Sequence, residues 1–118
     1  IDLETLSIDK QIDIFSSAEI IVSPTSSSLA NIVFCNEGTK VFEIKPKYQY
    51  PYENNLKSRY SFLCSLLGCK HYSMEADPVK IDNIDEITKK YIDKNVINQS
   101  NYYKNLLVKK NDFIKFIN

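Results

Sequence analysis

The first part of the chain shows a helical pattern of apolar residues followed by a strand-like one. Ile8, Ile12 and Phe15 recur at helical spacing, and Ser7 stands where a side chain can cap the first turn. The run 19–22 is short, β-branched and almost wholly apolar. This pattern is typical of a parallel strand that is buried on both faces. The sequence therefore predicts a helix and then a buried strand.

A polar loop and a second helix and strand come next. The loop 23–28 reads Ser-Pro-Thr-Ser-Ser-Ser and offers no core residue, whereas Leu29 and Ile32 begin a new helical pattern. Gly38 is placed to end that helix, and residues 40–44 form a second strand-like run. The loop therefore joins the end of one strand to the beginning of a helix.

The rest of the chain continues the alternation of helices and strands. The remaining predicted elements are a loop at 47–52, a helix at 53–67, a strand at 69–74, a solvated helix at 84–92, a polar surface excursion at 93–105, a short strand at 106–108, and a final helix capped by Asn111 that docks onto the sheet through Phe113, Ile114 and Ile117. Such alternation predicts an α/β fold, a Rossmann-like parallel sheet with helices on both faces.

Length and charge limit the classes of protein to consider. With 118 residues and 43% hydrophobic content, the chain is long enough for one domain, and we assign 1–118 to it. The chain begins at Ile1 without a methionine, so we expect a fragment of a longer protein with a domain upstream. The formal net charge is zero, which argues against a nucleic-acid partner. No apolar run approaches the roughly 20 residues that span a bilayer.

The cysteines and the histidine do not form a recognisable site in the sequence. Cys35, Cys64 and Cys69 are odd in number and lack Cys-x-x-Cys spacing, so we expect buried, reduced thiols. Cys69 and His71 stand on alternate strand positions and lack the three or four ligands of a zinc site. Neither has an evident base partner in the sequence. We therefore expect no metal site and no nucleophilic role here.

The serine-rich loop is the first candidate for ligand binding. Ligands of open parallel sheets bind beyond the carboxyl ends of the strands. There, Thr25, Ser26, Ser27 and Ser28 begin a helix whose unpaired N–H groups and positive dipole end favour an anion. Their hydroxyls add donors, which would suit a diphosphate. The alternative interpretation is that the serines only cap the helix.

The neighbouring strand and loops supply further candidates. Glu43 lies near the carboxyl end of its strand, where its side chain would contact ribose or sugar hydroxyls; alternatively, it is a surface carboxylate on an edge strand. Pro24 and Asn31 would support the loop, although Asn31 could also bond only locally. Three tyrosines would either border the pocket or pack the following loop onto the core: Tyr48, Tyr50 and Tyr52.

Several of these residues also match the signature of a known family. The matching positions are Val22, Pro24, Leu29, Asn31, Phe34, Gly38 to Val41, Glu43 and Ile44, and, farther on, Tyr60 to Gly68 and Tyr72. In this pattern the chain resembles glycosyltransferase family sixty-one, over residues 6–72 and over the C-terminal part of the family. The resemblance implies the donor-binding C-terminal half of a two-domain, GT-B-type enzyme.

The resemblance also implies an activity. The donor would be a nucleoside-diphosphate sugar, transferred with inversion to a glycan acceptor that an N-terminal domain upstream of Ile1 holds. Capsular or surface polysaccharide synthesis is the expected process. The catalytic base would lie in the missing half or at the interface, so no catalytic residue is named and the isolated chain should be inactive. No cofactor is expected, and no metal either, because the chain has no Asp-x-Asp motif.

The loop departs from the family pattern at the site itself. Where the family has Gly, His, Gly, Ala and Gly, this chain has Ser23, Thr25, Ser26, Ser27 and Ser28. Loss of the glycines costs close backbone approach to phosphate, whereas the added hydroxyls replace part of those contacts. A second hypothesis is therefore a catalytically silent Rossmann-like domain that serves as an interaction or assembly module. A homo-oligomer is one possible assembly. We expect a cytoplasmic protein, or a secretory-pathway lumenal one if it is eukaryotic.

Overall fold

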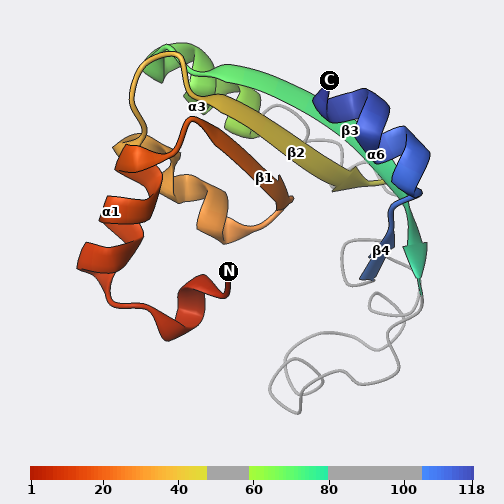
Figure 1. Cartoon of the computed structure of the whole chain (residues 1–118), viewed down its shortest axis with the longest axis horizontal. Coiled ribbons are helices and arrows are strands. Elements are labelled where there is room, and N and C mark those ends of the chain that lie inside the picture. The colour runs from red at the N-terminus through yellow and green to blue at the C-terminus, as the bar shows by residue number, and fades with distance from the viewer. Residues whose placement is uncertain (48–58, 80–104) are drawn as a thin grey trace. The chain divides into compact units, whose positions relative to one another are not determined.

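The computed structural model describes residues 1–47, 59–79 and 105–118 (Figure 1). The elements in chain order are η1 (Leu3–Thr5), α1 (Ile8–Ser17), β1 (Ile20–Pro24), η2 (Ser27–Phe34), β2 (Lys40–Pro46), α3 (Arg59–Leu67), β3 (Lys70–Val79), β4 (Asn105–Leu107) and α6 (Lys110–Ile117), where η marks a 3-10 helix. The helix predicted at 84–92 and the excursion predicted at 93–105, apart from residue 105, lie outside the described residues.

Contacts divide the chain into two compact units. Unit 1 consists of residues 1–45 and 57–74, and unit 2 consists of residues 46–56 and 75–118. All of α1, β1, η2 and α3 belong to unit 1, together with most of β2 and the first half of β3. The assignment of 1–118 to a single domain stays a prediction.

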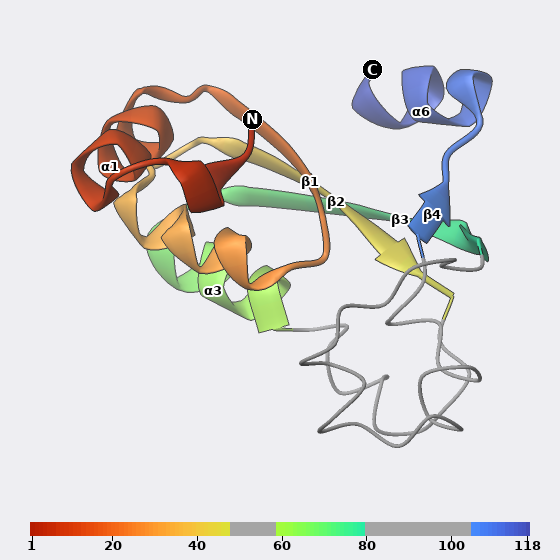
Figure 2. The same ribbon diagram turned by 90° about the horizontal axis from the view of Figure 1, so that it is seen from below.

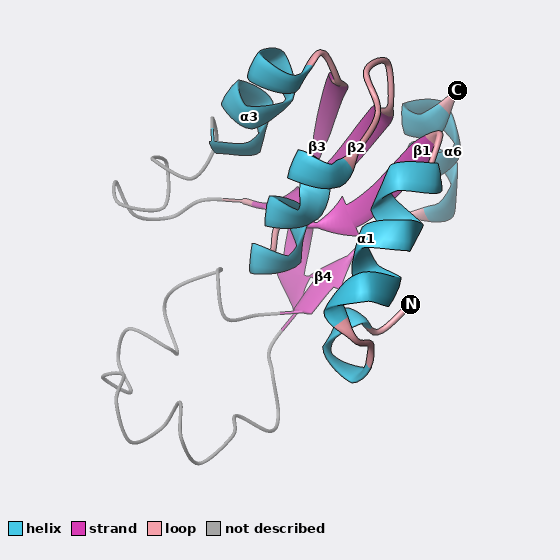
Figure 3. Cartoon of the chain, turned by 90° about the vertical axis from the view of Figure 1, so that its left-hand side faces the viewer, coloured by secondary structure: helices cyan, strands magenta, loops and turns pink. Residues whose placement is uncertain are grey.

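The strands of unit 1 form the expected parallel sheet. β1 and β2 pair in parallel, with Ile20 opposite Lys40 and Pro24 opposite Ile44. β3 lies on the other side of β2, and the Lys70 N–H donates to the carbonyl of Thr39 over 2.9 Å. Figure 3 shows the helices and strands that alternate along this unit. The predicted α/β class is therefore confirmed at the level of a parallel sheet with helices, which is compatible with a Rossmann-like fold.

Unit 2 contains the end of β3 and the elements that follow it. β3 pairs there with β4 in antiparallel fashion, with Asp77 opposite Leu107. The strand predicted at 106–108 is thus present, shifted by one residue. The exposed side chains of Lys47 and Asp77 form an ion pair of 2.5 Å, which raises the pKa of Lys47 and lowers that of Asp77 through their hydrogen bond and mutual attraction. At the surface, such a pair stabilises the fold little.

The first helix begins as its sequence predicts. The Lys10 N–H donates to the Ser7 hydroxyl over 3.4 Å, so Ser7 caps α1. The helix buries Phe15 and packs against η2. Glycines allow two tight turns farther along, since Gly38 has a φ of 87° and Gly68 a φ of 72°. Gly68 directly follows α3, as the pattern of that helix predicted.

The core of unit 1 lies between the sheet and two helices. η2 contributes Leu29 and Ile32, α3 contributes Tyr60 and Cys64, and β2 contributes Val41. Each of these side chains is at most 4% exposed. Because side chains alternate along a strand, the face of β2 that carries Val41 also carries the two residues at positions 43 and 45. Figure 2 shows α3 on one side of the strands.

β1 is not buried on both faces, contrary to the prediction from its composition. Ile20 is 56% exposed and Val22 is 44% exposed. Among the described strands β1 pairs only with β2, so it forms an edge of the sheet. Exposed and half-buried residues alternate along β1, so one face of the strand is open, and an apolar run in the sequence cannot show whether another element covers that face.

The last helix also differs from its prediction. α6 begins at Lys110 after an extended Lys109, without a side-chain cap, so that Asn111 lies inside the helix. Ile114 is 42% exposed and Ile117 is 39% exposed, so these two side chains are not buried, and docking of the helix onto the sheet stays a prediction. Helical periodicity identified the stripe, but the tertiary structure decides whether a stripe is covered.

The buried position of Ile32 makes a first prediction. Ile32→Ala should lower the free energy of unfolding by about 2–5 kcal/mol, because it removes a fully buried side chain and leaves a cavity. Val33→Ala is the matched control in the same helix, since Val33 is 49% exposed, and should change stability by about 0.5 kcal/mol or less. Urea unfolding measures both values. Equal losses would contradict the assignment of η2 to the core.

Candidate functional site

The serine-rich loop leaves the carboxyl end of β1 and is held by β2. The Thr25 N–H donates to the carbonyl of Ile44 over 2.9 Å, which continues the pairing of the two strands by one residue. The chain then enters η2, whose first internal hydrogen bond joins the Leu29 N–H to the carbonyl of Ser26 over 3.2 Å. The N–H groups that precede this bond lie at the start of the helix, where they have no partner within it.

The loop hydroxyls do not cap the helix in the way that the alternative interpretation requires. The Ser26 side chain makes no capping bond, although Ser26 is the N-cap residue of η2. Its hydroxyl lies 2.6 Å from that of Ser28. The Ser23 hydroxyl donates to the carbonyl of Pro24 over 2.8 Å. Ser27 is exposed. Helix capping thus does not explain why serines gather here.

An open cleft of about 540 Å³ lies beside this loop. Ser26, Ser27 and Ser28 line it together with the residues of β1, Pro24 included. The end of α1 and the η1 segment complete its wall, so the cleft lies wholly within unit 1. The ionisable side chains in its lining are Asp2 and Glu4. The cleft therefore presents neutral donors from the loop and acidic side chains from η1.

Thr25 differs from the other predicted diphosphate contacts. Its hydroxyl donates to Glu43 Oε1 over 2.9 Å, and it does not belong to the lining of the cleft. Thr25 thus directs its hydroxyl toward β2, while the three serines after it border the cleft. The structure separates these four residues into one that anchors the loop and three that face the opening.

Glu43 is the most buried charged residue that the structure describes. Its side chain is 0% exposed, and β2 has β1 on one side and β3 on the other. The alternative of a surface carboxylate on an edge strand is therefore wrong. Glu43 does not belong to the lining of the cleft that Ser26 to Ser28 border.

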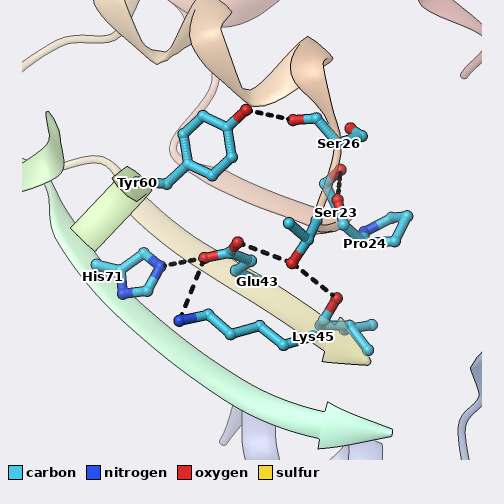
Figure 4. Close-up of polar contacts among 9 residues, drawn as sticks. Ser23, Pro24, Ser26, Glu43, Lys45, Tyr60 and His71 are labelled. Carbon is cyan, nitrogen blue, oxygen red and sulfur yellow. Dashed lines mark hydrogen bonds and ion pairs between the residues drawn. The ribbon is translucent and has the colours of Figure 1, made fainter. Parts of the chain in front are cut away.

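The Glu43 carboxylate has partners on both oxygens (Figure 4). Besides the Thr25 bond at Oε1, His71 Nε2 lies 2.8 Å from Oε2, and Lys45 Nζ lies 3.8 Å from the same oxygen. The side chains of His71 and Lys45 are 9% and 8% exposed. A buried carboxylate needs such partners, because burial without them costs several kcal/mol.

The interpretation that His71 has no acid or base partner is wrong. His71 stands on β3, 28 residues after Glu43, and the parallel pairing of β2 with β3 brings them together. Spacing within one strand cannot reveal this contact. A usable signal was the pair Glu43 and Lys45, two charged residues two positions apart, which lie on one face of an extended strand.

Tyr60 is a second residue that the sequence analysis did not assign to the site. Its ring is buried among the core residues, and its hydroxyl donates to the carbonyl of Ser26 over 2.7 Å (Figure 4). Asn31, predicted to support the loop, donates instead to Gln11 Oε1 over 2.9 Å and so ties η2 to α1. The predicted pocket border at Tyr48, Tyr50 and Tyr52 lies outside the described residues.

The three cysteines are free, as the sequence analysis predicted. Cys64 is buried, whereas Cys35 and Cys69 are half-buried. Burial raises the pKa of Cys35 and of Cys64 to about 11, and it raises that of Cys69 as well. Since the thiolate is the reactive form, these thiols are poor nucleophiles at neutral pH.

Comparison with known proteins places the loop in a family context. The family described as Glycosyltransferase 61 matches residues 1–42, which comprise α1, β1, the serine-rich loop and η2 and end in β2. The resemblance predicted from the sequence is thereby confirmed, and the match supports a glycosyltransferase. A search of curated proteins finds no match.

Two further findings concern metals and membranes. Within residues 1–47, 59–79 and 105–118, no group of three or more His, Cys, Asp or Glu side chains is arranged to hold a metal ion. None of the helices in the described part of the chain is long and apolar enough to cross a bilayer.

The buried network predicts the cost of removing its charge. Glu43→Gln should lower the free energy of unfolding by about 1–3 kcal/mol, because the amide has one acceptor oxygen where Thr25 and His71 need two. Glu19→Gln is the control, since Glu19 is exposed, and should stay within about 0.5 kcal/mol of the parent chain. Urea unfolding near neutral pH gives both values. A Glu43→Gln protein as stable as its control would refute the network.

The raised thiol pKa values predict a loss of stability in alkali. The pKa of a cysteine is near 9.0 in the unfolded chain, and burial raises the pKa of Cys35 and Cys64 to about 11 in the folded chain. The contribution of the two protonated thiols to the free energy of unfolding is therefore complete below about pH 9. It is lost as the pH rises from about 9 to about 11, because the unfolded thiols release protons first. The free energy of unfolding, measured in urea at about pH 8 and about pH 10, should fall more in the parent chain than in Cys35→Ala/Cys64→Ala. Equal slopes would contradict the assignment.

Proposed function

We propose that this chain is the donor-binding part of a glycosyltransferase and that its serine-rich loop holds the diphosphate of a nucleoside-diphosphate sugar. One observation carries the proposal: Ser26, Ser27 and Ser28 border an open cleft at the carboxyl end of a parallel strand, within the segment that matches the glycosyltransferase family. Open α/β sheets bind their ligands at this end of the strands.

The donors at the start of η2 suit a diphosphate. N–H groups at the start of a helix carry the positive end of the aligned peptide dipoles, and Ser27 and Ser28, the first residues of η2, border the cleft. The Ser26 and Ser28 hydroxyls lie within 2.6 Å of each other, so the two can converge on one phosphate oxygen. These groups are uncharged, and Asp2 and Glu4 stand nearby. Binding by this loop therefore depends on the direction of neutral donors.

The apolar part of the cleft suits the remainder of the donor. Ile20 and Val22 expose side chains on β1, and both line the cleft beside the serines. An exposed apolar wall is a favourable surface for the flat face of a nucleobase. In this arrangement the base lies along β1 and the diphosphate at the loop. The predicted contact between Glu43 and a ribose or sugar hydroxyl requires a ligand that extends past Thr25 to the buried carboxylate.

The wider activity follows from the family resemblance. We infer inverting transfer to a glycan acceptor in capsular or surface polysaccharide synthesis, with the acceptor and the catalytic base on a second domain of a GT-B-type enzyme. A cytoplasmic location is part of the same proposal.

One observation favours a second candidate function. The hydroxyls of Thr25, Ser23, Ser26 and Ser28 already bond within the loop or to β2, and the glycines of the family pattern are absent. A loop with satisfied side chains and no close backbone approach would suit a catalytically silent domain that serves in assembly.

A binding experiment separates the two candidates. The chain is titrated with uridine, guanosine and cytidine diphosphates up to millimolar concentration, and the melting temperature and the dissociation constant are measured. A nucleotide at about 100 times its dissociation constant should stabilise the fold by about 2.7 kcal/mol. No stabilisation by any of the three would favour the assembly module.

A variant with an added negative charge tests whether the ligand lies at the loop. Ser27→Glu adds a carboxylate to an exposed loop position and should weaken diphosphate binding about tenfold or more, because like charges repel across a short distance. Ser65→Glu is the matched control on the exposed side of α3 and should leave the dissociation constant unchanged. Equal affinities for both variants would exclude the loop as the diphosphate site.

A further inference from the structure

A continuous chain of hydrogen bonds runs from β3 to the serine-rich loop through one carboxylate. His71 Nε2 lies 2.8 Å from Glu43 Oε2, and the Thr25 hydroxyl donates to Glu43 Oε1 over 2.9 Å (Figure 4). The three side chains come from β3, from β2 and from the loop after β1. A single buried side chain thus links the far strand of the parallel sheet to the loop.

Burial gives this link its strength. The Glu43 side chain is 0% exposed and that of His71 is 9% exposed, so water does not compete for the bonds. In such surroundings hydrogen bonds are stronger than in water, and a lost partner is not replaced by solvent. The same contacts at an exposed position would leave the loop free to shift.

The charges of the cluster fix the direction of each bond. A carboxylate only accepts hydrogen bonds, so the bond to Glu43 uses the tautomer of His71 in which the Nε2–H group is the donor. Lys45 Nζ, 3.8 Å from the same oxygen, supplies the balancing positive charge. With Oε2 held by His71 and Lys45, the carboxylate cannot rotate freely, and Oε1 is left pointing at Thr25.

Thr25 transfers this constraint to the residues that border the cleft. Its N–H is bonded to the carbonyl of Ile44 over 2.9 Å, and its hydroxyl is bonded to Glu43. The next carbonyl, that of Ser26, accepts from the Tyr60 hydroxyl over 2.7 Å. The backbone is therefore held at two successive residues, immediately before Ser27.

We propose that His71 is a positioning residue of the donor loop: through Glu43 it orients Thr25 and so sets the placement of Ser26 to Ser28 in the cleft. His71 does not line the cleft, so it acts without touching the ligand. The expected effect of His71 on nucleotide affinity rests on the proposed function, whereas its expected effect on the conformation of the loop does not.

Two pairs of variants test the link. Thr25→Val keeps the shape of the side chain and removes the hydroxyl, whereas Thr25→Ser keeps the hydroxyl and loses a methyl group. His71→Phe removes the donor, whereas His71→Gln retains an N–H at similar reach. The dissociation constant for uridine diphosphate should rise about tenfold in Thr25→Val and His71→Phe, the equivalent of one hydrogen bond to a charged group. It should stay within about twofold in Thr25→Ser and His71→Gln. If the Thr25 side chain only fills space, Thr25→Val should bind the nucleotide better than Thr25→Ser does.

A second measurement needs no nucleotide. Amide hydrogen exchange of residues 25–28, followed by NMR on the whole chain, reports how firmly the loop is held. Exchange should be about tenfold faster in Thr25→Val and His71→Phe and unchanged in the two conservative variants. If His71→Phe does not fold, His71→Leu, which also removes the donor, takes its place with the same expected result.

The two measurements separate failure of this inference from failure of the proposed function. If the parent chain binds no nucleotide but loop exchange follows the predicted order, the positioning role stands and the donor site is wrong. If nucleotide binds and neither exchange nor affinity responds to the variants, the positioning role is wrong. Faster exchange without weaker binding would also overturn the link between His71 and donor affinity.

Discussion

The buried carboxylate of Glu43 is the constraint on which the described site depends. A charge without solvent exposure is tolerated only where donors satisfy it, and here the donors come from three separate parts of unit 1. Their convergence requires β2 to lie between β1 and β3 in parallel register. The same register places Thr25 opposite the end of β2, which is where the loop turns toward η2. Strand order, loop position and side-chain chemistry are thus mutually dependent.

Because of this constraint, the residues of the loop face two different parts of unit 1. Thr25 faces the strands and is fixed by them, whereas Ser26, Ser27 and Ser28 border the open cleft. A loop with glycines would reach a phosphate through its backbone, but it would also be conformationally freer. A loop of hydroxyl residues approaches a ligand less closely with its backbone but offers side-chain donors. Such donors must be held in place, and the hydrogen bonds from Tyr60 to the Ser26 carbonyl and from Thr25 to Glu43 hold the backbone of the loop.

The family match and the geometry support each other without overlapping completely. The match ends at residue 42, one residue before Glu43, and includes the whole of the loop and η2. Glu43 on β2 and His71 on β3 lie after the matched segment, and they meet only because the two strands are neighbours in the sheet. The cleft beside β1 combines exposed apolar side chains with neutral donors from the loop. The family match supports a glycosyltransferase, and the assignment of the cleft to its donor is the proposal made above.

Local pattern in the sequence predicted the alternation of helices and strands that the described residues show and a loop after the first strand, which in the structure consists of Thr25 and Ser26 between β1 and η2. Ser7 as a cap and residue 67 as the end of a helix are predicted correctly because capping and periodicity signals act over a few residues. Only the tertiary structure decided that β1 is an edge strand and that Glu43 meets His71, because these depend on which strands become neighbours. The histidine and its carboxylate are 28 residues apart, and no periodic pattern extends over that separation. Contacts of that kind exist only once the sheet has formed.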